Sequence, residues 1–267
     1  MFEPYLSRWQ LLPDGEPIMT HGSRLLPVRR GAVPAMLKIA LDDDEAIGNQ
    51  LMAWWAGAGA APVLAQEGAA LLMARAEGGR SLLDLARHGE DDQASRLACA
   101  CLARLHAPRP GPSPSLLSLA RWFQALRPAA AREGGVLLES LVAADALLAD
   151  PRDVVVLHGD AHHENILDFG EHGWLAIDPK RVRGERGFDF ANLICNPQLP
   201  TATDPARFTR QVAVIAEAAD LPRQRLLQWV LAYSGLSAAW FLEDRNQAGA
   251  GHQRQVARLA AEALAQS

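Results

Sequence analysis

The first eighty residues alternate short apolar runs with turn-forming residues, which is the pattern of β-strands joined by tight turns. We expect strands at 9–12, 17–19, 25–28, 35–39, 63–66 and 70–74. One helix interrupts them, because apolar residues recur at helical spacing at Ile47, Leu51 and the Trp54-Trp55 pair. An aspartate at 42, 43 or 44 can cap its start. This order of elements predicts a small β-rich lobe, which we place at residues 1–76.

After Ser81 the apolar residues follow a helical period. We expect helices at 81–88, 92–106, 115–126, 134–149, 204–219, 222–242 and 249–265. Prolines between 108 and 114 predict a rigid connector between the second and third of these helices. The chain is therefore predicted to be an α+β protein of two lobes, with a larger helical lobe at 77–267.

A β-hairpin is predicted inside the helical part of the chain. The apolar runs 166–169 and 174–177 lie on either side of four turn-forming residues. In the register that such a loop favours, Asn165 faces Asp178. Opposite residues of an antiparallel pair lie roughly 4.5–5.5 Å apart, so an amide oxygen and a carboxylate would lie side by side. Two hard oxygen ligands of this kind suit Mg²⁺ bound to a polyphosphate.

The turn before this hairpin follows a predicted strand at 154–157 and is rich in polar residues. It reads His158-Gly159-Asp160-Ala161-His162-His163-Glu164-Asn165, and Ile177-Asp178 ends the hairpin. An Asp, an Asn five residues later and an Asp after the next strand is the order of the base and metal ligands in kinases. The stretch resembles the catalytic loop of the aminoglycoside phosphotransferase family, His-Gly-Asp-x-His-x-x-Asn followed by Ile-Asp. The His162-His163 pair and Asp178-Pro179 are most similar to its streptomycin 6-kinase and hydroxyurea phosphotransferase branch.

The resemblance implies a protein-kinase-like fold and ATP-dependent phosphorylation of a hydroxyl on a small molecule, with a streptomycin-like aminoglycoside as the expected acceptor. It implies that Asp160 accepts the hydroxyl proton and that His158 buttresses the loop. Asn165 and Asp178 would hold Mg²⁺. A later segment resembles the family's Gly-x-x-x-Asp-x-Ala, which implies that Asp189 supports the loop by accepting backbone N–H groups.

Lys38 lies inside an apolar run that is predicted to be a strand, where an ammonium group is costly unless it is paired. A compact ammonium at this place suits contact with the α- and β-phosphates of ATP. Glu45, in the first turn of the following helix, is its natural partner. The alternatives are an edge-strand charge for Lys38 and an acid favoured by the helix dipole for Glu45.

Two further segments are candidates for nucleotide contacts. The loop 20–24 lies where kinases cover the phosphates and offers Gly22 and Ser23, but it holds a single glycine. The segment after the last predicted strand resembles the hinge between kinase lobes. There, backbone groups near Ala74 and Ala76 would bind the adenine edge.

Two functions of other classes remain open. The cluster His158, Asp160, His162 and His163 could ligate zinc or another metal in a metal-dependent hydrolase or phosphoesterase. The additional Asp, Asn and His ligands of such hydrolases do not appear downstream with the required spacing. A pseudokinase that binds nucleotide without turnover is compatible with the thin phosphate loop. Within the kinase class, the alternative is a kinase of another small metabolite.

The composition limits the choice of partners. The chain of 267 residues is 49% apolar with a net charge of −5, which is typical of a globular protein and lacks the basic balance of nucleic-acid binders. Cys99, Cys101 and Cys195 do not form a disulfide framework. There is no signal-peptide pattern and no apolar run of transmembrane length, so we expect a cytoplasmic protein without membrane or nucleic-acid partners. The sequence does not determine the oligomeric state.

Glu243 and Asp244 end a predicted helix, where acids are unfavourable for the helix dipole. This placement makes them candidates for an acidic wall that binds a cationic acceptor. A solvated helix end is the alternative.

Overall fold

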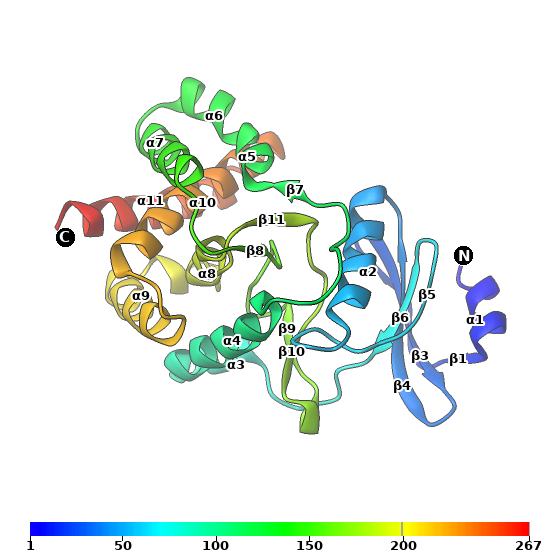
Figure 1. The fold of residues 1–267 in the computed structure, drawn as a ribbon. Helices are drawn as coiled ribbons and strands as arrows, with labels where there is room; N and C mark the ends of the chain where they lie inside the picture. Colours follow the sequence, from blue (N-terminus) through cyan, green and yellow to red (C-terminus); the bar gives the residue numbers. More distant parts are fainter. Residues whose placement is uncertain (199, 267) are drawn as a thin grey trace.

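The computed structural model describes residues 1–198 and 200–266, which form a β-rich lobe and a helical lobe (Figure 1). The strands of the first lobe are Leu11–Pro13 (β1), Ile18–Met19 (β2), Ser23–Arg30 (β3), Val33–Ala40 (β4), Val63–Glu67 (β5) and Ala70–Ala74 (β6). They form one antiparallel sheet in the order β1-β3-β4-β6-β5, with β2 paired to β3. The N-terminus lies beyond the sheet, and the C-terminus lies at the opposite end of the molecule. The α+β prediction is confirmed.

The two faces of this sheet are covered by different helices. Successive residues of β4 point to opposite faces. Leu37 therefore lies in an apolar cluster that is covered by α1 (Glu3–Trp9), whereas Lys38 points to α2 (Asp43–Trp55) and its Glu45. This alternation places the ammonium group of Lys38 on the side of the sheet that faces the helical lobe.

Helix α1 replaces the start of the predicted strand 9–12, so that prediction was wrong for Trp9. Pro4 lies in the first turn, where a missing N–H has no cost. Tyr5 and Trp9 are four residues apart and their ring centroids lie 5.2 Å apart, which stabilises the short helix. Gln10 has a left-handed φ of 54° and ends it, so the strand begins at Leu11.

Helix α2 brings side chains of the small lobe to the lobe junction. The carboxylate of Asp42 caps it by accepting the N–H of Glu45 at 2.9 Å, as one of the predicted caps. Gly48 lies on the side that faces the helical lobe. A Cβ atom on Gly48 would lie 2.7 Å from the carbonyl oxygen of Pro179, so the helix packs directly on the backbone there.

The helical lobe confirms most of the predicted helices. The helices of this lobe are α3 (Leu82–Arg87), α4 (Asp91–His106), α5 (Leu119–Trp122), α6 (Leu126–Glu133), α7 (Val136–Ala149), α8 (Gly187–Ile194), α9 (Pro205–Ala218), α10 (Arg223–Glu243) and α11 (Gln247–Ala265). Helix α10 runs through the centre and is buried along most of its length. Helix α8, which was not predicted, is buried at every position. It spans only eight residues, which is too short for an apolar period to identify a helix.

The predicted helix 115–126 is broken into shorter pieces. Strand β7 (Leu117–Ser118) pairs with β11 (Val182–Glu185), and a 3₁₀ turn at Phe123–Ala125 separates α5 from α6. Pro128 has no N–H to donate to the carbonyl of Gln124, so an uninterrupted α-helical ladder cannot form there.

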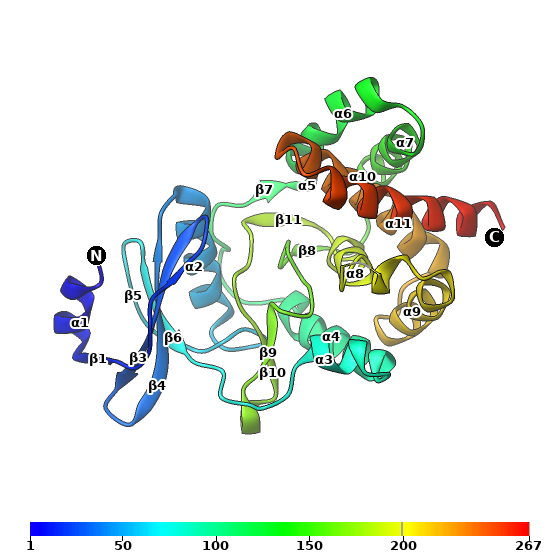
Figure 2. The same ribbon diagram turned by 180° about the vertical axis from the view of Figure 1, so that it is seen from behind.

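Two small β units lie between the lobes, and Figure 2 shows the hairpin beside α4. Strand β8 (Val154–Val156) pairs with β11, and β9 (Ile166–Asp168) pairs with β10 (Trp174–Ala176). The predicted hairpin is present, but its register was wrong by one residue.

The shift in register comes from the hairpin loop. The Phe169 N–H donates to the carbonyl of Gly173 at 2.8 Å, and a 3₁₀ turn lies between these two residues. The loop therefore begins at Phe169 and has one more residue than predicted. Asp168 therefore faces Trp174. The Ile177 N–H donates to the carbonyl of Asn165 at 2.9 Å, so Asn165 faces Ile177 and not Asp178.

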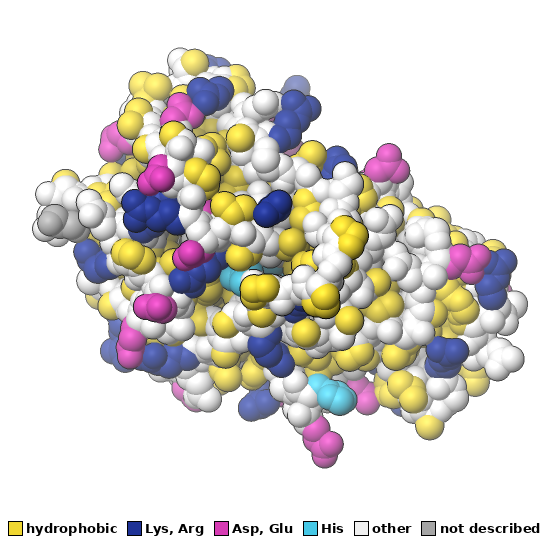
Figure 3. Space-filling model, in the orientation of Figure 1, with side chains coloured by type: hydrophobic (Ala, Val, Ile, Leu, Met, Phe, Trp, Pro, Cys, Tyr) yellow, Lys and Arg dark blue, Asp and Glu magenta, His cyan; other side chains and the backbone are white. Residues whose placement is uncertain are grey.

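Charged side chains of both signs are interspersed with apolar ones on the face of the molecule in Figure 3. None of the helices in the described part of the chain is long and apolar enough to cross a membrane. A grouping of charged side chains lies between α2 and the segment after β10, where Lys38 and Glu45 meet Asp178.

Candidate active site

The polar loop 157–165 leaves β8 and folds back against the segment that follows the hairpin. The N–H of Lys180 donates to the carbonyl of His158 at 2.7 Å. Gly159 has a φ of 83°, and a Cβ atom there would lie 2.6 Å from Cγ1 of Val182. Only glycine fits this turn without displacing its neighbours.

Asp189 of α8 holds the start of this loop. Its carboxylate accepts the backbone N–H groups of His158 and Gly159, each at 2.8 Å. Nε2 of His106 lies 2.8 Å from the same carboxylate. Burial raises the pKa of Asp189, but the hydrogen bond and charge of His106 outweigh this effect and the pKa falls below its ordinary value. These are the contacts that the sequence analysis expected of Asp189.

His158 is fully buried and both of its ring nitrogens are engaged. Nδ1 accepts the N–H of Asp160 at 3.2 Å, so Nε2 carries the proton and donates to the carbonyl of Ile177 at 2.8 Å. The ring is stacked with Trp55 at a centroid distance of 6.4 Å. Burial lowers the pKa of His158, which keeps the ring neutral as these bonds require. His158 therefore orients the loop from behind.

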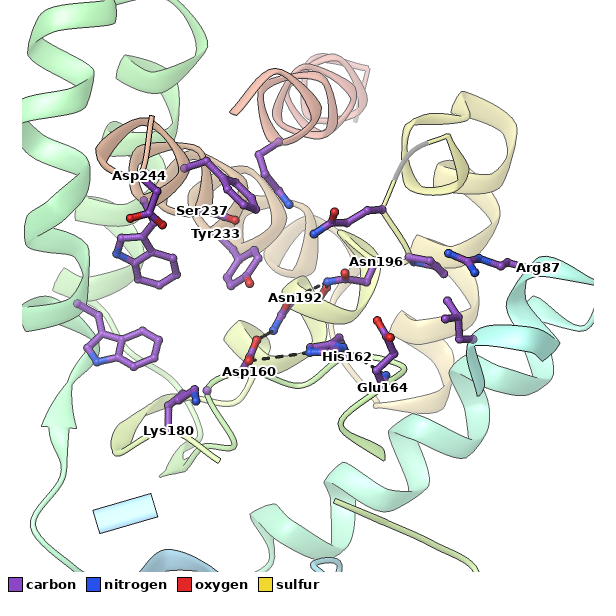
Figure 4. Close-up of a pocket in the computed structure, with 18 residues that line it drawn as sticks. Arg87, Asp160, His162, Glu164, Lys180, Asn192, Asn196, Tyr233, Ser237 and Asp244 are labelled. Carbon is purple, nitrogen blue, oxygen red and sulfur yellow. Dashed lines mark hydrogen bonds and ion pairs between the residues drawn. The ribbon is translucent and has the colours of Figure 1, made fainter. Parts of the chain in front are cut away.

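Asp160 borders a hollow of about 560 Å³ in the helical lobe (Figure 4). Nδ2 of Asn165 lies 2.9 Å from the backbone oxygen of Asp160 and 3.3 Å from Oδ2 of Asp160. Nδ2 of Asn192, from α8, lies 3.3 Å from Oδ1. Nε2 of His162 is 3.9 Å from Oδ2. Each carboxylate oxygen thus has an amide donor that fixes its direction, and each keeps a lone pair for a ligand.

Asn165 and Asp178 meet at a second hollow of about 280 Å³, which the sheet and α2 enclose. Since the amide nitrogen of Asn165 donates to Asp160, its amide oxygen is the atom left for a cation. Asp178 has a left-handed φ of 57°, and its carboxylate contacts Lys38. An amide oxygen and a carboxylate are a hard-oxygen donor set that fits Mg²⁺. The shifted register separates the two residues along the hairpin, but both still border one hollow.

Two lysines and two acids form a closed ring of ion pairs beside this hollow, which we call the charge ring. Nζ of Lys38 lies 2.6 Å from Oε2 of Glu45 and contacts Oδ1 of Asp178. Nζ of Lys180 lies 3.0 Å from Oε1 of Glu45 and 3.3 Å from Oδ2 of Asp178. Each ammonium therefore binds one oxygen of each carboxylate. The Lys38–Glu45 pair is as predicted.

The members of the charge ring keep each other ionised. Burial raises the pKa of Asp178, but the charges of Lys38 and Lys180 outweigh it and lower the pKa to about 2. Burial likewise raises the pKa of Glu45, and Lys38 reverses the shift. The opposite holds for Lys180, because its two carboxylate partners raise its pKa despite burial. The ring therefore carries two positive and two negative charges at neutral pH.

The smaller hollow combines apolar and polar walls. The apolar side chains that line it are those of Ile18, Leu25, Met52, Leu71, Met73 and Ile177. Ser23 also borders it, but its hydroxyl donates to Oε2 of Glu45 at 2.8 Å. Its N–H donates to Oγ1 of Thr20 at 3.0 Å. Both donors of Ser23 are therefore engaged within the small lobe.

Three predicted nucleotide residues are not among the described residues that line this hollow. The Ala74 N–H donates to the carbonyl of Pro62 at 2.8 Å, so that amide is unavailable to an adenine edge. Ala76 is likewise not among the described residues that line the smaller hollow. A Cβ atom on Gly22 would lie 2.8 Å from Cγ of Glu45, so Gly22 makes room for Glu45.

Comparison with known proteins identifies the family. Residues 8–245 match the model of the aminoglycoside/hydroxyurea antibiotic resistance kinases. The chain belongs to this family. It is 50% identical over 244 residues to the streptomycin 3''-kinase of Klebsiella pneumoniae, covering 90% of this chain and 91% of that protein. It is 30% identical to the streptomycin 6-kinase of Streptomyces griseus, covering 96% and 87%.

A solved structure confirms the protein-kinase-like fold of this antibiotic resistance kinase. A thermostable aminoglycoside phosphotransferase variant, in ternary complex with ADP and hygromycin B, superposes with a TM-score of 0.65 at 15% identity. The match covers 97% of each chain. The family resemblance that the polar loop indicated is confirmed over residues 8–245 by the family model.

The kinase assignment agrees with the arrangement of the histidines. Within residues 1–198 and 200–266, no group of three His, Cys, Asp or Glu side chains could hold a metal ion. His158 uses both ring nitrogens inside the loop. His163 is buried away from Asp160, with no hydrogen-bond partner for either ring nitrogen in the described chain. The predicted alternative of a metal-dependent hydrolase is therefore not supported.

The larger hollow of this kinase is bordered by one of the two acids predicted for it. Its walls include Trp122, Tyr233, Ser237, Trp240, Asp244 and Gln253. Asp244 caps the end of α10, and Figure 4 shows its carboxylate beside the aromatic walls. Both acids are exposed, but Glu243 is not among the described residues that border the hollow. Neighbouring helix positions point about 100° apart, which separates the pair.

The sequence analysis missed Lys180 and Asn192. Lys180 is the only lysine besides Lys38, and it lies two residues after Asp178, which is the signal that could have identified it. Asn192 lies three residues after Asp189. On a helix this spacing puts both side chains on one face, so both can reach the same loop.

Proposed function

We propose that this chain transfers the γ-phosphoryl group of ATP to a hydroxyl of a cationic aminoglycoside, with streptomycin as the expected acceptor. One observation carries the proposal: Asp160, a carboxylate open to the larger hollow, is hydrogen-bonded to Asn165, which borders the hard-oxygen site with Asp178. The side chain of Asn165 thereby connects the proposed base, Asp160, with the proposed metal site. Nucleotide binding is assigned to the lobe 1–76 and acceptor binding to the lobe 77–267.

Asp160 acts as the base in this proposal. The amides of Asn165 and Asn192 hold its two oxygens in place, so a lone pair can accept the proton of a hydroxyl in the larger hollow. His158 and Asp189 fix the backbone on either side of the turn. The acceptor hydroxyl thus meets a carboxylate that needs little reorganisation.

Asn165 and Asp178 would hold Mg²⁺ through the amide oxygen and the carboxylate. A bound Mg²⁺ neutralises the charge that develops on the phosphate oxygens during transfer. Lys38, held by Glu45, would contact the α- and β-phosphates. The apolar walls from the sheet would enclose the base of the nucleotide.

The walls of the larger hollow suit a hydroxylated cation. Streptomycin carries guanidinium groups and many hydroxyls, which pair with carboxylates and with aromatic faces. Glu164 and Asp244 supply negative charge there, and Trp122 and Trp240 supply aromatic faces in edge contact at 5.4 Å. The higher identity to the streptomycin 3''-kinase than to the 6-kinase favours the 3''-hydroxyl as the site of transfer.

Purified protein with Mg²⁺ and ATP tests the proposal on a panel of streptomycin, a neutral hexose, choline and hydroxyurea. We expect one phosphoryl group on streptomycin by mass spectrometry, with phosphorus coupling to the 3'' position by NMR. Coupling at the 6 position would correct the regiochemistry and leave the enzyme class intact. Turnover of choline or the hexose in preference to streptomycin would contradict the proposed acceptor.

The Asp160→Asn variant, purified in parallel, controls for contaminating kinases. Activity that is equal in both preparations would not belong to this site. ATP consumption without any phosphorylated acceptor would identify a hydrolase activity and overturn the proposal.

A further inference from the structure

Lys180 lies at the boundary between the two hollows. Its side chain borders the larger hollow together with Asp160. Its Nζ atom lies 3.3 Å from Oδ2 of Asp178, which borders the smaller hollow. Of the two lysines in the described charge ring, Lys180 therefore borders the larger hollow, next to the proposed base Asp160.

The two lysines of the charge ring occupy different environments. The side chain of Lys38 is 5% exposed and borders the smaller hollow, whereas that of Lys180 is 31% exposed and borders the larger one. They bind the same two carboxylates from opposite sides. Lys38 therefore faces the nucleotide in our proposed function, and Lys180 faces the acceptor.

The charge balance of the ring changes when its proposed ligands bind. A divalent cation at Asp178 would compete with Lys180 for that carboxylate and would leave Glu45 as the partner of the ammonium group in the charge ring. The phosphate oxygens of a nucleotide held at Asp178 would offer this ammonium a further anion. A lysine is suited to follow them, because its ammonium is a compact charge on a flexible stem.

We propose that Lys180 is a further catalytic residue, which binds the oxygens of the phosphoryl group while it passes from the nucleotide to the acceptor. The inference rests on the proposed function. In this step the acceptor oxygen bonds to the γ-phosphorus, and the bond to the β,γ-bridging oxygen breaks, with its electron pair leaving on ADP. Asp160 receives the hydroxyl proton. Lys180 stabilises the three non-bridging oxygens, over which negative charge is spread in the transition state.

Steady-state kinetics of Lys180→Met and Lys38→Met separate this role from a structural one. We expect Lys180→Met to lower kcat at least a hundredfold and to change the KM for Mg·ATP less than threefold. Lys38→Met, the matched control, should mainly raise the KM for Mg·ATP. Lys180→Arg keeps the charge and should recover at least tenfold of the lost kcat. If Lys180→Met raises the KM for Mg·ATP as Lys38→Met does and spares kcat, Lys180 only holds the ring together.

Calorimetry with a transition-state mimic tests the same contact without turnover. Aluminium fluoride with Mg·ADP mimics the transferring phosphoryl group, and the wild type should bind Mg·ADP at least tenfold more tightly in its presence. Lys180→Met should lose this gain and bind Mg·ADP alone as the wild type does. An equal gain in both proteins, or no gain in the wild type, would overturn the proposal.

This measurement needs no acceptor. If streptomycin and the other acceptors are not phosphorylated, the proposed function fails while the role of Lys180 is still decided by the fluoride complex. Thermal unfolding of each variant shows whether the fold persists, and Lys180→Arg provides the comparison if Lys180→Met unfolds.

Discussion

A Cβ atom on Gly48 would lie 2.7 Å from the carbonyl oxygen of Pro179, so the two residues bring α2 and the segment after Asp178 into direct backbone contact. Arg181 and Asp44 form an ion pair of 2.6 Å across the same junction. The position of Asp178 is therefore set by a helix of the small lobe as well as by its own hairpin.

We expect Gly48→Ala to lower the melting temperature and to raise the KM for Mg·ATP several-fold. Alanine is favoured over glycine inside a helix by about 1 kcal/mol, but here its methyl group would push α2 away from Pro179. Gly251→Ala in α11 is the matched control, because an added Cβ meets nothing within 4 Å there, and it should be stabilising. A Gly48→Ala protein as stable as the control, with an unchanged KM, would contradict the tight contact.

Asp160→Asn should lower kcat by about two or more orders of magnitude, which is the usual loss on removal of a general base. The new amide keeps the shape of the side chain, and its oxygen can still accept a hydrogen bond from Asn165 or Asn192. The affinity for Mg·ATP, measured by calorimetry, should barely change. Near-normal turnover would show that another group takes the proton.

Asp178→Ala should abolish the part of ATP binding that depends on Mg²⁺, because the carboxylate supplies most of the charge of the site. Asn165→Ala should weaken it less. In EDTA, ATP binding to Asp178→Ala should not be weaker than to the wild type, since Lys38 and Lys180 lose a competing anion. Calorimetric titrations with and without Mg²⁺ measure both effects, and equal Mg·ATP affinity in wild type and variant would exclude Asp178 as a ligand.

The neighbours Glu243 and Asp244 provide a test of the acceptor site. Asp244→Asn should raise the KM for streptomycin several-fold at low salt and less at high salt, because an ion pair with the acceptor would be lost and salt screens such a pair. Glu243→Gln removes the same charge one residue away from the hollow and should leave that KM unchanged. Equal shifts in the two variants would point to a general surface-charge effect instead.

Acid should destabilise the protein through the buried His163. Burial lowers the pKa of His163 from 6.5 to about 3. Above pH 6.5 neither state holds this proton, and between pH 6.5 and 3 the unfolded chain takes it up while the folded protein does not. The free energy of unfolding therefore falls as the pH falls through this window, by about 2 kcal/mol at pH 5 from His163 alone.

The variant His163→Leu removes this contribution and leaves those of His158 and His252, whose pKa values burial also lowers. Urea unfolding at pH 7 and pH 5 should show that the variant loses about 2 kcal/mol less than the wild type between the two. Equal losses would mean that His163 becomes protonated in the folded protein.

Local patterns in the sequence predicted the parts of the fold that local physics determines. The strands of the small lobe have their turn residues, and α2 has its cap at Asp42, so both were found. Helices α8 and α1 span only eight and seven residues, which is too short for a periodic signal, so neither was predicted. The predicted hairpin register was wrong because the loop has one extra residue, closed by a backbone hydrogen bond from Phe169 to Gly173. An alternating pattern of apolar residues does not reveal the length of a loop.

The site was predictable where the residues lie in one segment. Asp160 and Asn165 share a loop, and Asp189 has its own motif. Lys180 was missed because its role depends on Glu45, which is 135 residues away and reaches it only when α2 packs on the helical lobe. Ala74 was assigned to an adenine contact by analogy, while its N–H is used by Pro62.

The charge ring also bears on the order in which the ligands arrive. The carboxylate of Asp178 already has two ammonium partners, so a free metal ion would have to displace both and leave Glu45 as their one remaining carboxylate in the charge ring. A metal ion that arrives on a triphosphate brings the anions that Lys38 and Lys180 need. The protein is therefore expected to ignore free Mg²⁺ at concentrations that saturate the nucleotide, and to take metal and nucleotide as one ligand.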